Sequence, residues 1–211
     1  MENFKNSACE LYVRAMGAEL GQVFSELLHE VAFLNSKWQI YENLFSHSKE
    51  RIALLNKISA QFFGILQEIL LGDLHLHIAK LTSAIKSNRQ KNLTIRQLPD
   101  LLNESLLPEI EPLINSSIEL CMVSSTWRNK KFAHIDYDHA LEYDSTLPEF
   151  SRSDIEKAVN AISAVINRIN LYYFNSEIKF KSDKIEYQSV DRIIQYLNMG
   201  LKAEEAIKSR P

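Results

Sequence analysis

Apolar side chains recur every three or four positions over most of the chain, which is the spacing of one face of an α-helix. The first run covers residues 18–45, and the second begins near residue 52 and continues toward residue 85. A third run covers about residues 109–127, and a fourth covers residues 155–173. The pattern predicts an all-α fold, an antiparallel helical bundle of four to five long helices.

Polar residues and glycines suggest where these helices begin and bend. Ser153 and Glu156 have the spacing of a capping box, in which each side chain bonds the backbone of the other residue. Gly64 and Gly72 lie within the second run, so a kink or a close helix contact is expected there. Residues 86–108 read as a connector with one short helical turn at residues 94–102.

The C-terminal tail differs from the rest of the chain. Residues 177–187 alternate between apolar and polar with a period of two around a turn, which is compatible with a short hairpin. The apolar spacing after residue 190 predicts a final short helix that ends at Gly200. We therefore expect a helical bundle over residues 1–175 and a small appendage over residues 176–211.

Composition narrows the class of protein. The chain has 211 residues, of which 45% are hydrophobic, and a formal net charge of −3, so it is no global polycation that coats nucleic acid. Its two cysteines, Cys9 and Cys121, match no metal or disulfide framework and suit a reducing cytoplasm. The N-terminus does not resemble a signal peptide, and the apolar stretch at residues 62–71 is too short to span a membrane. We expect a cytoplasmic protein without membrane contact.

Most familiar catalytic signatures are absent. His75 and His77 are two residues apart on a predicted helix, so their side chains point in different directions and one metal ion does not easily bind both. The chain has no G-x-S-x-G motif and no glycine-rich phosphate loop, which disfavours hydrolase and nucleoside triphosphatase activities. No metal and no cofactor is predicted.

Basic residues are unevenly distributed. Residues 80–99 hold five basic residues and no acid, residues 128–131 add three more, and residues 136–149 hold five acids and no lysine or arginine. The five basic residues of the first stretch are Lys80, Lys86, Arg89, Lys91 and Arg96. Two interpretations are open: ordinary solvated surface patches, or two basic stretches that flank a phosphate-binding cleft.

Arg128 and His134 have the residue types that metal-independent RNA cleavage requires. Histidine can move protons near neutral pH, and a guanidinium can hold a phosphate where negative charge builds up. On an ideal α-helix the two side chains would be separated by about 120° and about 9 Å. They converge only if the helix ends or bends between them, or if a second subunit brings its own copy. A structural arginine and a surface histidine are the simpler alternative.

The segment Arg128-Asn129-Lys130-Lys131-Phe-Ala-His134 resembles the motif of the HEPN superfamily, an arginine and a polar residue followed after a short gap by histidine. Further blocks resemble the HEPN branch named after a type-U abortive-infection protein, over roughly residues 20–170. These blocks are residues 43–56, 62–67, 79–82 and 92–98. The chain departs from the branch at Lys80-Leu-Thr-Ser83, where relatives tend to have Arg-Leu-Thr-Asp.

The resemblance implies a helical bundle that forms a homodimer and cleaves RNA to 2′,3′-cyclic phosphate ends, as a toxin or abortive-infection protein with an antitoxin partner. It implies His134 as general acid and base, Arg128 as phosphate ligand and Asn129 as an orienting group. We add Lys130 and Lys131 as contacts to the RNA backbone. The alternatives are a non-catalytic HEPN module for dimerisation, nucleotide binding or partner binding in a defence system, and a regulatory, antitoxin-like subunit.

Overall fold

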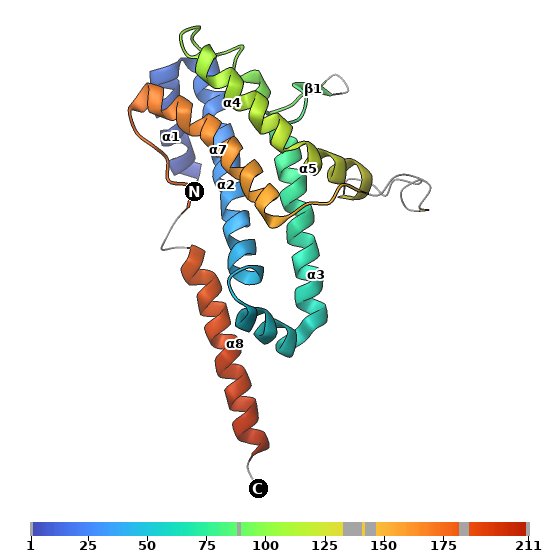
Figure 1. The fold of residues 1–211 in the computed structure, drawn as a ribbon. Coiled ribbons are helices and arrows are strands. Elements are labelled where there is room, and N and C mark those ends of the chain that lie inside the picture. Colours follow the sequence, from blue (N-terminus) through green and yellow to red (C-terminus); the bar gives the residue numbers. More distant parts are fainter. Residues whose placement is uncertain (1, 88–89, 133–140, 142–146, 182–185, 210–211) are drawn as a thin grey trace. The chain divides into compact units, whose positions relative to one another are not determined.

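The computed structural model describes residues 2–87, 90–132, 141, 147–181 and 186–209, and these residues are predominantly helical (Figure 1). The α-helices are α1 (Glu2–Met16), α2 (Ala18–Phe45), α3 (Lys49–Leu81), α4 (Leu107–Leu120), α5 (Met122–Trp127), α7 (Arg152–Phe174) and α8 (Glu186–Lys208). The smaller elements are the strands β1 (Lys86–Ser87) and β2 (Gln90–Lys91), the 3₁₀ helix η1 (Ile95–Gln97) and the π-helix η2 (Arg128–Phe132). The predicted all-α helical bundle is confirmed.

Contacts divide the chain into two compact units. Unit 1 consists of residues 1–34 and 74–180, and unit 2 consists of residues 35–73 and 181–211. Helices α2 and α3 each contribute one part to either unit. This grouping follows spatial contact rather than chain order. The predicted boundary after residue 175 divides the chain at one point, whereas each unit combines two separate segments, so that boundary stays a prediction.

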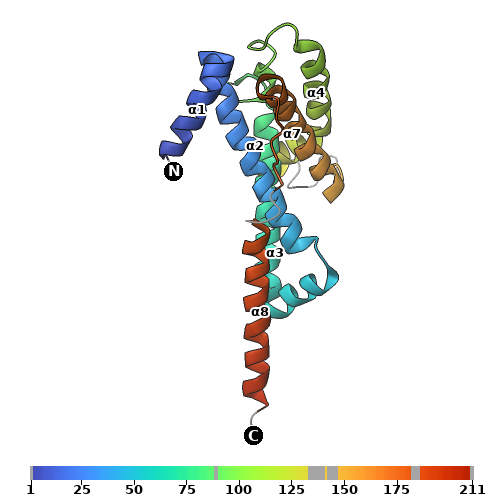
Figure 2. The same cartoon turned by 90° about the vertical axis from the view of Figure 1, so that its left-hand side faces the viewer.

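The core of unit 1 contains the face of α7 that the sequence predicted. Its apolar side chains are buried, and α4 lies beside α7 in both views (Figure 1 and Figure 2). The buried apolar residues of α7 are Ile155, Ala158, Val159, Ile162, Val165, Ile166 and Ile169. Each fully buried isoleucine contributes about 1.5–3 kcal/mol to stability. Arg168, late in α7, pairs with Glu109, early in α4, so the two helices are antiparallel.

The capping box of α7 lies two residues before its predicted place. Ser151 is the N-cap: its Oγ accepts a hydrogen bond from the Asp154 backbone N–H at 3.2 Å, and the Asp154 carboxylate accepts one from the Ser151 N–H at 2.8 Å. These bonds lower the pKa of Asp154. The predicted box at Ser153 and Glu156 is wrong because the same serine-to-acid spacing occurs twice, and only Ser151 has the extended backbone of a cap.

Helix α1 lacks the regular apolar spacing and was not predicted. Gly17 ends it with a φ of 89°, a left-handed conformation that favours glycine. One turn into α2, a Cβ on Gly21 would lie 2.5 Å from the Val13 backbone, so only glycine permits this close crossing of α1 and α2. The two glycines therefore fix how α1 folds back on α2.

Helix α3 is interrupted at Ser59, which has non-helical backbone angles. The predicted kink at Gly64 or Gly72 is wrong because the side chain of Ser59 restarts the helix: its Oγ accepts a hydrogen bond from the Phe62 N–H at 3.4 Å, as an N-cap does. The first part of α3 is joined to α8 by ion pairs within unit 2. These pairs are Arg51 with Asp191 at 2.7 Å and Lys57 with Glu205 at 2.8 Å.

The predicted hairpin in the tail is wrong. Residues 176–180 carry no strand, and Glu186 and Tyr187, the expected second strand, belong to α8. Helix α8 also continues past Gly200 to Lys208, because a glycine in an exposed helix costs only about 1 kcal/mol and does not end it.

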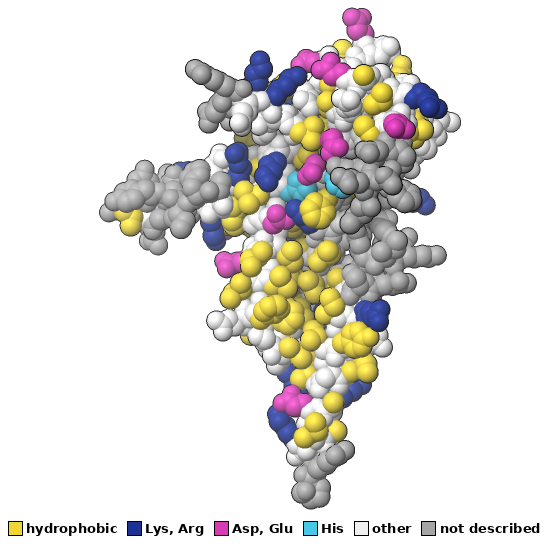
Figure 3. Space-filling model, turned by 180° about the vertical axis from the view of Figure 1, so that it is seen from behind, with side chains coloured by type: hydrophobic (Ala, Val, Ile, Leu, Met, Phe, Trp, Pro, Cys, Tyr) yellow, Lys and Arg dark blue, Asp and Glu magenta, His cyan; other side chains and the backbone are white. Residues whose placement is uncertain are grey.

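Unit 2 exposes hydrophobic side chains, and Figure 3 shows such side chains gathered on one face. On α3, Phe62, Ile65 and Ile69 are each more than half exposed and lie on the same side of the helix. Helix α3 is also long and apolar enough to cross a membrane by length and composition, with 39% of its most apolar window buried. Because core helices of soluble proteins meet the same criteria, this is weak evidence, and the absence of membrane contact stays a prediction.

Candidate functional site

The helix that carries Arg128 changes its hydrogen bonding at that residue. Helix α5 ends at Trp127, and the π-helix η2 covers Arg128–Phe132. Such wider turns are rare and are frequent at functional sites. The sequence required the helix to end or bend between Arg128 and His134, and this requirement stays a prediction. His134 itself lies outside the described residues.

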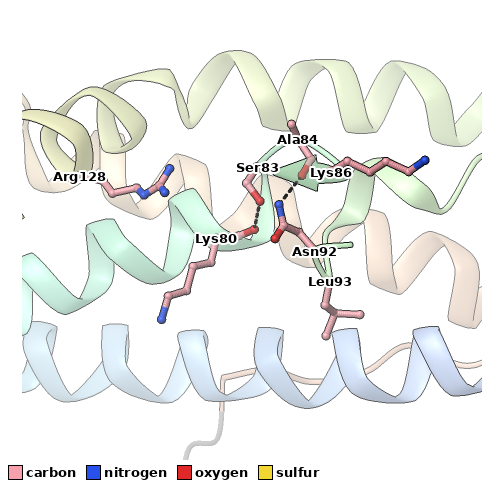
Figure 4. Close-up of a pocket in the computed structure, with 7 residues that line it drawn as sticks. All are labelled: Lys80, Ser83, Ala84, Lys86, Asn92, Leu93 and Arg128. Carbon is pink, nitrogen blue, oxygen red and sulfur yellow. Dashed lines mark hydrogen bonds between the residues drawn. The ribbon is translucent and has the colours of Figure 1, made fainter. Parts of the chain in front are cut away.

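Arg128 lies at the edge of a cavity of about 490 Å³ in unit 1 (Figure 4). The described residues that line it are Lys80, Ser83, Ala84, Lys86, Asn92, Leu93 and Arg128. Three of them are basic, and none of these seven is acidic. The structure thus brings together Lys80 and Lys86 from one basic stretch of the sequence and Arg128 from the other. This is the arrangement that the interpretation as a phosphate-binding cleft requires.

The three cations around this cavity have no carboxylate partner in the part of the chain that the structure describes. Among the described residues, Lys80, Lys86 and Arg128 form no ion pair, whereas cations such as Arg51 and Arg168 each pair with a carboxylate. Lys80 and Lys86 are exposed and Arg128 is half-buried. Positive charges gathered without counter-ions raise the local potential and attract anions. The cavity is therefore suited to a phosphate group.

Figure 4 shows how the side chains are directed. The Arg128 guanidinium points toward the turn that carries Ser83, the Lys80 ammonium points away toward another helix, and the Lys86 ammonium points away on the far side. The cations thus spread around the cavity and do not converge on one point.

A network of side-chain hydrogen bonds fixes the turn between α3 and η1, which forms one wall of the cavity. Each donor bonds a backbone carbonyl oxygen of the turn or of the end of α3. The pairs are Ser83 Oγ with Lys80 at 2.9 Å, Asn92 Nδ2 with Ala84 at 2.8 Å, Thr94 Oγ1 with Leu81 at 2.8 Å and Arg96 Nε with Thr82 at 2.7 Å. Bonds of this kind satisfy carbonyl groups that a helix end leaves open. This wall is consequently held by its own polar groups before any ligand arrives.

Strands β1 and β2 form a small antiparallel pair within the same turn, in which Lys86 lies directly opposite Lys91. Residues directly opposite each other in an antiparallel pair direct their side chains to the same face, and like charges in that position repel. The sequence predicted no strand here, because two-residue strands leave no periodic pattern. Arg89, in the basic stretch that contains both lysines, lies outside the described residues.

Aromatic rings surround His75 next to η2. The ring centroid of His75 lies 5.9 Å from that of Trp127, 5.7 Å from that of Phe132 and 4.5 Å from that of Phe150. The Trp127 indole N–H also donates a hydrogen bond to the Pro148 carbonyl oxygen at 2.8 Å. We call these four rings the ring cluster. It fastens residues 127–132 to residues 148–150, the two ends of the segment that contains His134.

His75 and His77 are buried and have different partners. His75 Nδ1 lies 3.0 Å from Ser124 Oγ, and burial lowers the pKa of His75 to about 4, so its ring is neutral at pH 7. His77 Nε2 lies 2.9 Å from a carboxylate oxygen of Glu30. Over the described ranges, no group of three or more histidine, cysteine or acidic side chains has the arrangement of a metal site.

The lining of the cavity does not include Asn129, Lys130 or Lys131. Asn129 is exposed and Lys130 is half-buried. The Lys131 ammonium lies 5.4 Å from the centroid of the Trp127 ring, within the range of a cation–π contact. Of the predicted site residues that the structure describes, it brings Arg128 alone to the cavity. The roles predicted for Asn129, Lys130 and Lys131 stay predictions.

Lys80 and Lys86 were not named as site residues from the sequence. The available signal was the absence of any acid over residues 80–99, which leaves the cations of that stretch without a local partner. The ring cluster gave no such signal, because His75 and Trp127 are far apart in the chain and meet only through the packing of α3 against α5.

Comparison with known proteins identifies the family of this chain. The family HEPN_AbiU2, described as AbiU2, matches residues 17–193, which include both basic stretches, Arg128 and His134. No curated protein and no solved structure matches the chain. Because the match covers most of the sequence and agrees with the helical fold, the chain belongs to the AbiU2 family of the HEPN superfamily.

Proposed function

We propose that this protein is a metal-independent endoribonuclease of the abortive-infection type, in which Arg128 and His134 act on one phosphodiester. The observation that carries the proposal is the position of Arg128: a guanidinium without a carboxylate partner among the described residues, at the edge of a basic cavity and at the start of a π-helix. Membership of the AbiU2 family supports the biological role.

The reaction follows from the chemistry of the two side chains. His134 removes the proton of a ribose 2′-OH, and the oxygen attacks the adjacent phosphorus. The bond from phosphorus to the 5′-oxygen breaks, and that oxygen takes up a proton. The products are a 2′,3′-cyclic phosphate and a 5′-OH. Arg128 binds the phosphate oxygens in a bidentate manner while negative charge builds up on them.

The remaining predicted residues act on the substrate. Asn129 orients the scissile phosphate, and Lys130 and Lys131 contact neighbouring phosphates. In a homodimer, a second His134 supplies the proton to the leaving 5′-oxygen. Single-stranded or looped RNA is the expected substrate because its backbone is open to side chains. The enzyme acts in the cytoplasm and arrests growth during phage infection, under the control of an antitoxin partner.

Cleavage of mixed RNA in the presence of EDTA tests the proposal. Arg128→Ala and His134→Ala are each expected to reduce the rate at least about 100-fold, since one donor to a transition-state oxyanion is worth about that factor. Arg152→Ala and His29→Ala, which remove an exposed arginine and an exposed histidine of unit 1, are matched controls and should retain wild-type rates. The ends of the products should be 2′,3′-cyclic phosphates.

Two results would overturn the proposal. Cleavage that persists in both variants would remove Arg128 and His134 from the mechanism. RNA binding without any cleavage by the wild-type protein, also with divalent ions added, would instead support a non-catalytic HEPN binding module.

A further inference from the structure

We propose that the β1–β2 strand pair is a guide for the RNA strand, in which Lys86 and Lys91 bind phosphates next to the one held by Arg128. The inference rests on the proposed function and adds to it a second binding region, more than thirty residues away from the Arg128 motif in the chain.

The first argument is that, among the described residues, the lysine pair has no partner that would stabilise it. Lys86 and Lys91 lie directly opposite each other on two very short strands, where their like charges oppose pairing. The described residues offer neither of them a carboxylate. An anion bound between them would convert this repulsion into attraction, so the arrangement indicates an external partner.

The second argument is continuity with the site. Lys86 lines the same cavity as Arg128, and Lys91 shares its face of the strand pair. The wall between them is fixed by hydrogen bonds from Ser83 and Asn92 to backbone carbonyl oxygens. A ligand that contacts Arg128 and crosses this wall therefore reaches Lys86 without any rearrangement of the turn.

The third argument concerns the shape of the anion. The Arg128 and Lys86 head groups point in different directions and do not converge (Figure 4). A single phosphate would be best held by converging groups, whereas an extended polyanion has several phosphates in a row, each of which needs one cation. The exposed side chain of Leu93, which also lines the cavity, offers an apolar surface to a base or a ribose. These features favour a strand over a free nucleotide.

Binding measurements separate this inference from catalysis. A fluorescent single-stranded DNA oligonucleotide has the same phosphates as RNA but no 2′-OH, so it binds without being cleaved. Its affinity is measured by anisotropy over a range of salt concentrations. For Lys86→Ala/Lys91→Ala, we expect affinity about tenfold weaker at low salt and a salt slope smaller by about 1.4, since each phosphate contact to a single strand contributes about 0.7.

The matched control is Lys179→Ala/Lys202→Ala, which removes two exposed lysines elsewhere and changes the net charge equally. It should keep the wild-type salt slope. At limiting RNA, the Lys86→Ala/Lys91→Ala variant should show a kcat/KM about tenfold lower, in line with its weaker binding of the oligonucleotide. If this variant does not fold, as judged by circular dichroism, Lys86→Gln/Lys91→Gln replaces it.

An unchanged affinity and salt slope in a folded variant of a protein that does cleave RNA would overturn the guide while leaving the proposed function intact. Binding of inorganic phosphate and of a mononucleotide tests whether the cavity holds a single phosphate group instead of a strand. If either binds as tightly as the oligonucleotide, and loses the same affinity in the variant, the cavity holds one phosphate and the strand path is wrong.

Discussion

The cavity around Arg128 and the ring cluster around His75 both take residues from the short helical segment 127–132, yet the two regions differ in chemistry. The cavity is lined by cations without carboxylate partners among the described residues, and its polar wall is bonded to backbone. The ring cluster is neutral and aromatic, with one buried imidazole.

The difference indicates how the two regions divide their tasks. Side chains of the ring cluster gain free energy from contacts within the protein, so their loss should appear as lower stability. The cationic side chains of the cavity have no carboxylate partner among the described residues, so their loss should appear in binding and cleavage. Substitutions in the two regions should therefore affect different measurements, and three of them test the comparison through stability.

The largest stability loss is expected for Trp127→Ala. The substitution removes a half-buried indole from the ring cluster and its hydrogen bond to the Pro148 carbonyl oxygen. We expect the free energy of unfolding to fall by about 3 kcal/mol, as for other large aromatic truncations. Urea denaturation followed by circular dichroism measures it. Trp127→Phe keeps a ring and loses the hydrogen bond, so it should cost only about 1 kcal/mol. Equal losses for both variants would contradict the importance of the rings.

A smaller effect is expected from pH. Burial lowers the pKa of His75 to about 4, whereas an unfolded histidine has a pKa near 6.5. Between these values the unfolded chain binds a proton that the folded chain does not, so stability falls as the pH is lowered from 7 to 5. The expected contribution over this range is about 2 kcal/mol. Denaturation at pH 7, 6 and 5 should show a flatter dependence for His75→Phe than for the wild type.

His29→Gln is the matched control for this pH dependence, because His29 is exposed on α2 in the same unit. Its stability should fall with pH as in the wild type. A pH dependence that His75→Phe leaves unchanged would show that the imidazole is protonated equally easily in the folded and unfolded chains.

The smallest stability change is expected for Arg128→Ala. Because this guanidinium has no ion-pair partner among the described residues, its removal should change the free energy of unfolding by less than about 0.5 kcal/mol. Arg51→Ala, which breaks the pair with Asp191 and a bond to the Asn43 carbonyl oxygen, should cost about 1–2 kcal/mol. Thermal melts of both variants test the contrast. A large destabilisation by Arg128→Ala would assign that residue a structural role.

Local patterns predicted the elements of the fold well. The buried face of α7 follows directly from the spacing of its apolar residues, and the start of α2 and the short turn at η1 agree with the expectation. The prediction for the tail was wrong because two short alternating runs resemble strands. In the structure, the helix α8 forms ion pairs with two residues of α3, Arg51 and Lys57. A sequence pattern contains no information about such a partner from another part of the chain.

The chemistry of the candidate site was predictable from the sequence, but its spatial arrangement was not. The chemistry of Arg128 and the absence of acids over residues 80–99 are properties of the sequence alone, and they indicated a basic site. Which of these cations meet around one cavity depends on how α3 lies against α5, and which of them find carboxylates depends on distant residues. The direct opposition of Lys86 and Lys91 likewise depends on a register that two-residue strands do not reveal.

The hydrogen bond from Trp127 to Pro148 has a consequence for how this family can diversify. It joins Trp127 to Pro148, so the number of residues between these two positions can change while both stay in place. Lengthening this segment to twice its size adds only about 0.6 kcal/mol of closure entropy. Insertions and deletions between residues 133 and 147 are therefore a low-cost way to alter the sequence around His134, the proposed general acid and base, without disturbing Arg128.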